Sequence, residues 1–388
     1  MKKLLLMTAI VSLLLSGCAP KDDASKKSDP KPSEPSLISA EKISQTTITP
    51  SLDENSYQIF DRLFAKEDKN KNFILSPLSI QRVLDLMALS TDDREAFAAL
   101  SVYDENDLQK LDLENSVMES LILLNEKYVP NFPKIPFDNI KLLEFPEPAT
   151  REKMELQKRV LGEILDSKPI DADSSFVFTD AIRYYAQWLS PFNDALTFDQ
   201  PFTTADGREI MTPTMFQKNN APAYVDEDKE IFALHGKENS VVYFIKPKKD
   251  PATLDLRSAM KDFKERAETA EVHFHLPKVE FKSTIDLKNS FEALGLGILH
   301  QEFVLEKLIP DTPLLMSKAT QIATLKIDEK GAEAKASTSM DGNSIALIKT
   351  LEIKMDSPYY IVLTDFEKNT RQEIIAFVAY VADPSLTE

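Results

Sequence analysis

The sequence predicts an α+β domain in which amphipathic helices come first and strands follow. Apolar residues recur with helical spacing early in the chain, most clearly in the segment after Pro77. Runs rich in β-branched and aromatic residues dominate from residue 271 onward. Residues 51–388 contain neither a second linker nor an internal repeat, so we expect one large domain over that range.

The individual elements follow from these patterns in chain order. Apolar residues at helical spacing predict helices over 56–67, after Pro77, over 149–165 and from 250 to 267. Apolar and aromatic runs predict strands over 174–187, 239–246, 272–281, 316–327, 359–363 and 373–381. Together they predict a large mixed sheet on which the helices pack.

The N-terminus has the pattern of an export signal. Two lysines precede an apolar run that is too short to span a bilayer stably, and this stretch ends Leu15-Ser16-Gly17-Cys18. The ending resembles the bacterial lipobox, in which the cysteine is acylated and becomes the new N-terminus. Residues 1–17 are therefore expected to be a lipoprotein signal peptide and Cys18 the lipidated residue. The alternative is an ordinary signal peptide that contains a cysteine by chance.

Residues 18–50 are expected to be a tether. They are rich in Lys, Asp, Ser and Pro, a composition that buries too little apolar surface to order itself. Acyl chains on Cys18 would hold the protein on a membrane, because each buried CH₂ contributes about 0.8 kcal/mol. Ala19 after the cysteine favours export to the outer membrane, with the domain periplasmic or surface-exposed. Cys18 is also the only cysteine, so the fold has no internal disulfide.

Composition and motifs give little support for an enzyme or a nucleic-acid-binding protein. The formal net charge of -17 repels nucleic acid and anionic membrane surfaces. Residues 39–42 fit the S-x-x-K pattern of penicillin-binding enzymes, but no K-T-G partner follows. His273 and His275 could form half of a zinc site on one strand face, but no cysteine or third histidine lies near them in sequence. We therefore predict no catalytic residues, no metal and no cofactor.

Several motifs resemble those of the serpin family in order and spacing. They are Asn72-Phe73-Ile74-Leu75-Ser76-Pro77-Leu78-Ser79-Ile80, Trp188-Leu189-Ser190-Pro191-Phe192, Leu276-Pro277-Lys278-Val279, Asp328-Glu329-Lys330-Gly331 and Phe377-Val378-Ala379-Tyr380-Val381. The resemblance covers nearly all of the chain after residue 55. It implies the serpin fold, with helices packed on a large mixed central sheet and an exposed reactive loop. It also implies a monomeric suicide inhibitor of serine or cysteine proteases rather than an enzyme.

Two departures from the family pattern fall at one place. In the family, an Asn and a His meet Ser76 and Ser79 beneath the sheet, where strands part, but here those positions hold Asp180 and Gln321. A buried polar group without a partner costs about 1–3 kcal/mol. We therefore expect Asp180 to accept and Gln321 to donate, as a coupled replacement in this sheet-opening cluster.

The reactive loop, residues 331–355, has the alternation that strand insertion requires. One face is small and the other polar, because side chains of a strand alternate with period two. The small face holds Ala332, Ala334, Ala336 and Thr338, the polar face holds Glu333, Lys335, Ser337 and Ser339, and Gly331 is the expected hinge. No proline lies between 331 and 357, so every amide can join a ladder. The alternative is a plain surface loop, as in the non-inhibitory relatives, which typically carry bulky, charged or proline residues on the inserting face.

The bond cut by a target protease is expected near the end of this loop. Counting forward from Gly331 by the family's spacing gives Ile345-Ala346, and counting back from Pro358 gives Leu347-Ile348. These aliphatic residues suit elastase-like or subtilisin-like proteases. Lys349 lies close by and suits a trypsin-like protease.

Overall fold

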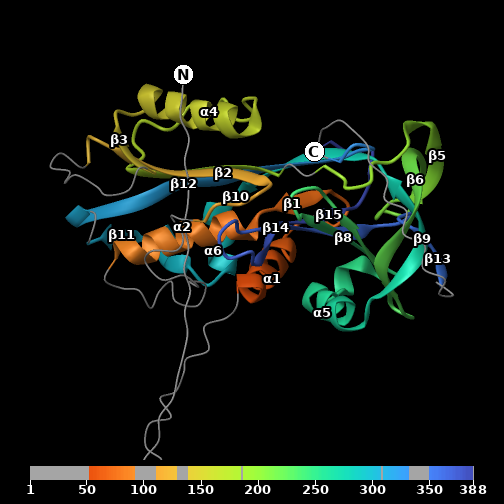
Figure 1. Cartoon of the computed structure of the whole chain (residues 1–388). Coiled ribbons are helices and arrows are strands. Elements are labelled where there is room, and N and C mark those ends of the chain that lie inside the picture. The colour runs from red at the N-terminus through yellow and green to blue at the C-terminus, as the bar shows by residue number, and fades with distance from the viewer. Residues whose placement is uncertain are drawn as a thin grey trace, which may run out of the picture. The chain divides into compact units, whose positions relative to one another are not determined.

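Two β-sheets form the framework of the chain, as the computed structural model shows (Figure 1). The structure describes residues 52–91, 111–128, 139–184, 187–306, 309–331 and 349–387. The predicted signal peptide, Cys18 and the whole tether lie outside these residues. Within the described ranges, no helix combines the length and apolar character needed to cross a bilayer.

The first sheet has six strands among the described residues. Its order is β10 (Val279–Asp286), β12 (Ile309–Ile327), β4 (Phe176–Tyr184), β2 (Ser116–Asn125) and β3 (Ile140–Leu143), with β11 (Glu302–Leu305) paired to β12. Most neighbours are antiparallel, but β12 and β4 run parallel, as do β2 and β3. This mixture agrees with the predicted α+β class. We call this sheet the central sheet.

The second sheet has nine strands among the described residues. Its order is β1 (Phe73–Leu75), β15 (Glu373–Val381), β14 (Tyr359–Phe366), β8 (Val241–Pro247), β7 (Lys229–His235), β6 (Glu209–Val225), β9 (Glu268–Pro277) and β13 (Thr350–Lys354), with β5 (Thr197–Thr203) paired to β6. Strand β13 lies at the C-terminal end of the predicted reactive loop and at an edge of this sheet, where it pairs parallel with β9.

Helices cover both faces of the central sheet (Figure 1). The helices of the described residues are α1 (Leu52–Phe64), α2 (Pro77–Ser90), α4 (Glu147–Leu161), α5 (Leu256–Arg266) and α6 (Leu287–Ala293), with short 3₁₀ turns at Asp194–Leu196, Pro251–Thr253 and Gly297–His300. Helix α5 packs against β6 of the second sheet rather than on the central sheet. Helix α4 lies on one face, which we call the outer face, and α2 lies beneath the other, the inner face. The cluster that joins α4 to the sheet includes Leu156, Val160, Val177 and Ile322.

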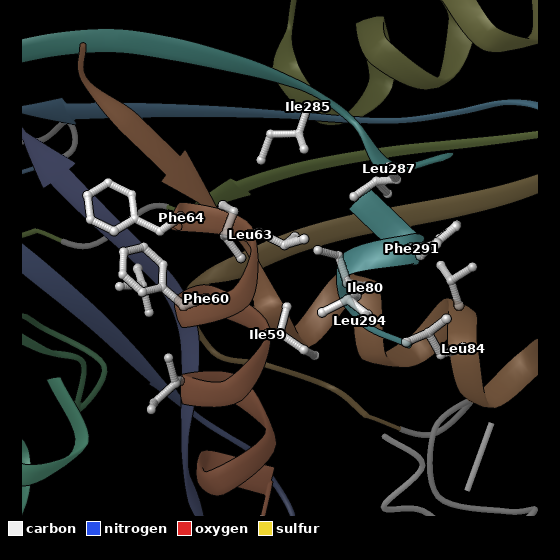
Figure 2. Close-up of a cluster of buried hydrophobic side chains, with 14 of the residues drawn as sticks. Ile59, Phe60, Leu63, Phe64, Ile80, Leu84, Ile285, Leu287, Phe291 and Leu294 are labelled. Atoms are coloured by element: carbon white, nitrogen blue, oxygen red, sulfur yellow. The ribbon is translucent and has the colours of Figure 1, made fainter. Parts of the chain in front are cut away.

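The first helices form because their apolar residues share one face. In Figure 2, Ile59 and Leu63 of α1 lie on the side of Ile80 and Leu84 of α2, whereas Phe60 points to the other side and stacks on Phe64; all of these side chains are buried. Residues of and around α6 close this cluster from the third side; they are Ile285, Leu287, Phe291 and Leu294. The start of α2 is fixed by Ser76, whose Oγ accepts from the N–H of Ser79, and by Pro77 at the first helical position.

Two sequence predictions about element boundaries are wrong. The helix expected from 250 to 267 is a 3₁₀ turn followed by α5, because Asp250 and Asp255 each cap the N-terminus of a separate element. The strand expected over 272–281 is two strands, β9 and β10, which belong to different sheets. The chain passes between the sheets at Lys278, whose N–H donates to the carbonyl of Pro213.

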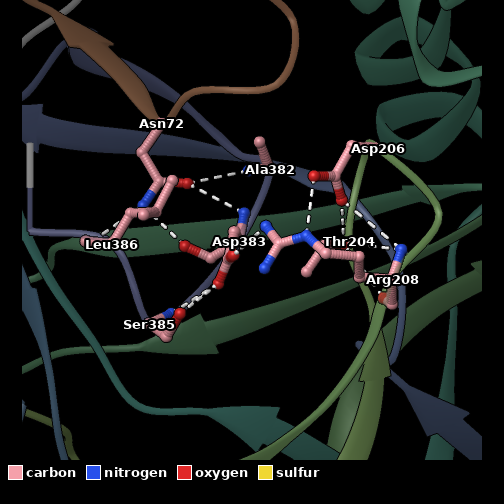
Figure 3. Close-up of polar contacts among 8 residues, drawn as sticks. All are labelled: Asn72, Thr204, Asp206, Arg208, Ala382, Asp383, Ser385 and Leu386. Carbon is pink, nitrogen blue, oxygen red and sulfur yellow. Dashed lines mark hydrogen bonds and ion pairs between the residues drawn. The ribbon is translucent and has the colours of Figure 1, made fainter.

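The C-terminal segment is tied back onto the sheets by Asn72 (Figure 3). The Asn72 Oδ1 accepts from the N–H groups of Ala382 and Asp383 at 2.8 and 3.1 Å. Its Nδ2 donates to the carbonyls of Asp383 and Leu386 at 2.8 and 3.1 Å. Asp383 also forms an ion pair with Arg208 at 3.2 Å. One buried amide therefore anchors the end of the described chain.

Candidate functional site

The two parallel neighbours β4 and β12 form the centre of the candidate site. Their register runs from Met316 opposite Phe176 to Thr324 opposite Arg183. We call this pair of strands the joint. A strand placed inside the joint could run antiparallel to both neighbours at once. The chain that leaves β12 has that direction if it turns back on itself.

Gly331 is placed where such a turn is needed. It follows β12 after three residues and has a φ of 94°, in the left-handed region that glycine adopts without a steric cost. Its N–H donates to the carbonyl of Asp328 at 3.2 Å. The other predicted hinge residues, Ala332, Glu333, Ala334, Ala336 and Thr338, lie outside the described residues.

On the inner face, the structure brings the four residues of the predicted sheet-opening cluster together. Gln321 and Asp180 are register partners across the joint, and the Nε2 of Gln321 lies 3.4 Å from the Oδ2 of Asp180. The Gln321 amide also donates to the Ser76 carbonyl at 3.1 Å and to the Ser79 Oγ at 2.5 Å. Its Oε1 accepts from the N–H of Ser76 at 2.9 Å. The cluster therefore links β12, β4 and α2.

Asp180 is the ionisable member of this cluster, and its side chain is buried. The Oδ2 accepts from the Ser79 hydroxyl at 2.5 Å, and the Oδ1 accepts from the Ser120 hydroxyl of β2 at 2.7 Å. Burial raises the pKa of Asp180 above that of an ordinary aspartate, while the hydrogen bonds from Ser79 and Ser120 and the charge of Arg82 oppose the rise. Sequence reasoning did not identify the Ser120 contact.

On the outer face, a shared carboxylate crosses the joint. Asp166, in the connection between α4 and β4, lies 3.0 Å from Lys153 of α4 and 3.2 Å from Lys318 of β12. The Lys153 side chain is only 4% exposed, and it also donates to the carbonyl of Lys168. Burial raises the pKa of Asp166, but hydrogen bonds from Lys153 and from the Lys168 N–H outweigh it and hold the pKa below its usual value. We call these three residues the outer latch.

The base of the reactive loop is held by a second set of contacts. The Nε1 of Trp188 donates to the carbonyl of Asp328 at 2.8 Å, and the N–H of Phe192 donates to the carbonyl of Glu329 at 2.8 Å. The Glu329 carboxylate accepts from Thr197 at 2.7 Å and pairs with Lys278 at 2.9 Å. Burial raises the pKa of Glu329, but the bonds from Lys278 and Thr197 outweigh it, so the pKa lies below its ordinary value.

The far end of the loop joins the second sheet at β13. Lys349 is exposed, and its carbonyl accepts from the N–H of Glu271 at 3.0 Å. The other candidate cleavage residues, Ile345, Ala346, Leu347 and Ile348, lie outside the described residues. The structure therefore describes the start of the loop at Gly331 and its last part from Lys349 onward.

The two histidines considered as half of a zinc site have other contacts. The Nε2 of His273 lies 2.8 Å from Glu271, and the Nδ1 of His275 lies 3.0 Å from the Oε1 of Gln200. The ring of His275 also packs against Phe216, with 4.9 Å between the ring centroids. Within the described ranges, no group of three or more His, Cys, Asp or Glu residues is arranged to hold a metal ion.

Comparisons with known sequences point to one family. A model described as "Serpin (serine protease inhibitor)" matches residues 157–384, which is more than half of the chain. The hibernation-specific plasma protein HP-55 of Tamias sibiricus is 24% identical over 96% of this chain and 97% of its own length. The alpha-1-antitrypsin-like protein GS55-LT of Ictidomys tridecemlineatus is 25% identical over 98% of each chain.

Solved structures show the same fold. The thermophilic serpin tengpin in its native state matches with a TM-score of 0.69 and 19% identity, over 85% of this chain and 93% of tengpin. Human thyroxine-binding globulin matches with a TM-score of 0.69 and 18% identity, over 88% of this chain and 100% of its own. With the α+β architecture and the family match over residues 157–384, these findings establish that the chain belongs to the serpin family, which is described as a family of serine protease inhibitors.

Proposed function

We propose that this protein is an irreversible suicide-type inhibitor of serine or cysteine proteases. The protease nucleophile attacks a carbonyl carbon in the loop, the peptide C–N bond breaks, and the proton passes through the protease's own base to the leaving amine. The loop on the Gly331 side then inserts into the joint, pulls the acyl-enzyme with it and distorts the protease before water can complete hydrolysis. The inhibitor itself supplies no nucleophile and no base.

The observation that carries this proposal is the closed joint next to the turn at Gly331. Strands β4 and β12 are parallel neighbours, so an antiparallel ribbon that continues from β12 would pair with both of them. The small face of the loop would cover the inner side of the sheet without overpacking it. The stability of the uncut chain is then kinetic, because the uncut loop keeps the molecule from a more stable arrangement.

The direct test is to mix the full chain with elastase and with trypsin and to run a denaturing gel. An inhibitor gives a covalent band near the summed mass of the two proteins. The cut chain should also unfold at a clearly higher temperature than the uncut chain. Cleavage without a covalent band would instead favour a non-inhibitory binding protein, and equal unfolding temperatures would contradict insertion.

Matched variants on the two faces of the loop sharpen this test. Ala334→Arg places a long charged side chain on the inserting face, so we expect cleavage without covalent complex. Glu333→Arg places the same side chain on the polar face and should leave complex formation nearly intact. Equal behaviour of the two variants would contradict the assignment of the faces.

The elastase-like or subtilisin-like preference and the membrane anchor are part of the same proposal. The aliphatic residues 345–348 support the first, and the lipobox-like ending at Cys18 supports the second. An inhibitor held on an exported membrane surface would shield the cell from external proteases. Radiolabelled palmitate incorporated by the natural protein, and lost in Cys18→Ala, tests the anchor.

A further inference from the structure

The inner cluster contains an ionisable group at the place where the joint would part. Asp180 accepts hydrogen bonds from three elements: from Ser79 on α2, from Ser120 on β2 and from Gln321 on β12. Each of these partners donates to one of the two carboxylate oxygens. The hydrogen bonding of this single carboxyl therefore depends on where the surrounding elements lie.

Only one of these donors sits across the joint. Neighbouring strands lie about 4.8 Å apart, so insertion of one more strand would move Gln321 away from Asp180 by roughly that distance. Ser120 lies on β2, next to β4, and can keep its bond, whereas Ser79 on α2 lies beneath the joint and is hydrogen-bonded to both Asp180 and Gln321. The carboxyl has three donors when the joint is closed, and we expect at most two of them to remain when it has parted.

The surrounding charges do not mask this difference. Arg82 is the charged group that acts on Asp180 from the inner face, and like Ser79 it lies on α2 beneath the joint. The groups that face Asp180 from β2 and β12 are a hydroxyl and an amide. Arg183, on β4 itself, is three residues further along and points to the outer face.

We propose that protonation of Asp180 loosens the joint, so that loop insertion is faster in mildly acidic solution than at neutral pH. This inference rests on the proposed inhibitory function. Hydrogen-bond donors favour the ionised form of a carboxyl, and the parted joint has lost one. The parted state therefore binds a proton more tightly than the closed state, and falling pH favours it. A difference of one unit in pKa between the two states corresponds to about a tenfold change.

The test measures insertion without any protease. A synthetic peptide with the sequence of residues 331–341 is added to the uncut full chain, and its incorporation is followed over time between roughly pH 5 and pH 8. Trp188, the only tryptophan, contacts the residues that precede Gly331 and gives a fluorescence signal. We expect incorporation by the wild type to accelerate several-fold, up to about tenfold, toward the acid end.

Two variants separate this effect from other titrating groups. Asp180→Asn keeps the shape and the hydroxyl contacts but cannot titrate, so its incorporation rate should not depend on pH. Gln321→Met removes the donor that crosses the joint, so it should also flatten the profile while Asp180 stays in place. The peptide is the same for every protein, so any effect of its own ionisable groups on the rate is shared by all of them.

Three results would contradict a role of Asp180 in opening the joint. A wild-type rate that does not change with pH, or a wild-type profile shared by both variants, would overturn this inference while leaving insertion itself intact. Failure of the peptide to enter any of the proteins at any pH would overturn the proposed function and this inference together.

Discussion

Lys318 of the outer latch offers a way to weaken the joint without touching its backbone ladder. Its ammonium lies 3.2 Å from Asp166, and its side chain is 39% exposed, so solvent screens the pair. Pairs of this kind contribute about 0.2–1 kcal/mol. Lys318→Met should therefore lower the barrier to insertion by up to about 1 kcal/mol, which corresponds to about a fivefold faster rate.

The other lysine of the outer latch should behave differently. Lys153 is nearly fully buried against Asp166, and it holds the connection to α4 rather than crossing the joint. Removing one partner of a buried pair costs about 3 kcal/mol or more. Lys153→Met should therefore mainly lower the unfolding temperature of the uncut chain, whereas Lys318→Met should mainly change the insertion rate.

The assay is incorporation of the 331–341 peptide at neutral pH and low salt. Lys326→Met is the matched control, because Lys326 lies on the same strand but pairs with Glu280 of β10, at 3.0 Å, away from the joint. At about 1 M salt, where the Debye length is about 3 Å, the gap between wild type and Lys318→Met should narrow. If Lys318→Met and Lys326→Met take up the peptide equally fast, Lys318 does not hold the joint.

The remaining predictions concern the base of the loop and the C-terminal anchor. Glu329→Gln removes the attraction to Lys278, so the unfolding temperature should fall by about 2 °C. The double variant Glu329→Lys with Lys278→Glu swaps the two charges and should restore the unfolding temperature. If it does not, the ion pair is not the cause of the loss. The pKa of Glu329 lies below the ordinary value of 4.5, so its stabilising contribution is present above that pH and is lost as pH falls through the folded-state pKa. The difference in unfolding temperature between wild type and Glu329→Gln should therefore disappear in acid. A difference that does not change with pH would contradict this. Asn72→Ala breaks four hydrogen bonds to the C-terminal segment, so it should lower the free energy of unfolding by about 2 kcal/mol. It should also speed removal of that segment by carboxypeptidase, whereas Asn70→Ala, at an exposed position, should not. Equal digestion of the two variants would count against the anchor.

Much of the fold could be predicted from local patterns, but β6 could not. It is 17 residues long and contains Pro213 and Pro222, which argue against a strand. The structure explains the exception, because each proline is in register with a residue of only one neighbouring strand. Pro213 pairs with β5 before the pairing with β9 begins, and Pro222 pairs with β9 just before the pairing with β7 begins. A missing N–H is tolerated where no second ladder requires it.

The candidate site also has a part that could be predicted from the sequence and a part that could not. Ser79, Asp180 and Gln321 are separated by 101 and 141 residues, so only the family resemblance could predict that they meet. No motif indicated the outer latch. A signal was nevertheless present, because Lys153 interrupts the apolar stripe of α4 between Ala149 and Leu156, and all three side chains are buried. A lysine in such a stripe requires a buried partner, but the sequence does not say that Asp166 is that partner.

Strand β10 forms one margin of the central sheet, and its outward side is already occupied. The N–H of Lys282 donates to the carbonyl of Thr387, and the Ser283 hydroxyl accepts from the N–H of Ile74. An uncovered margin is where strands of other molecules add and where aggregation begins. Because the C-terminal segment and β1 already contact this margin, addition of a strand from another molecule is suppressed there.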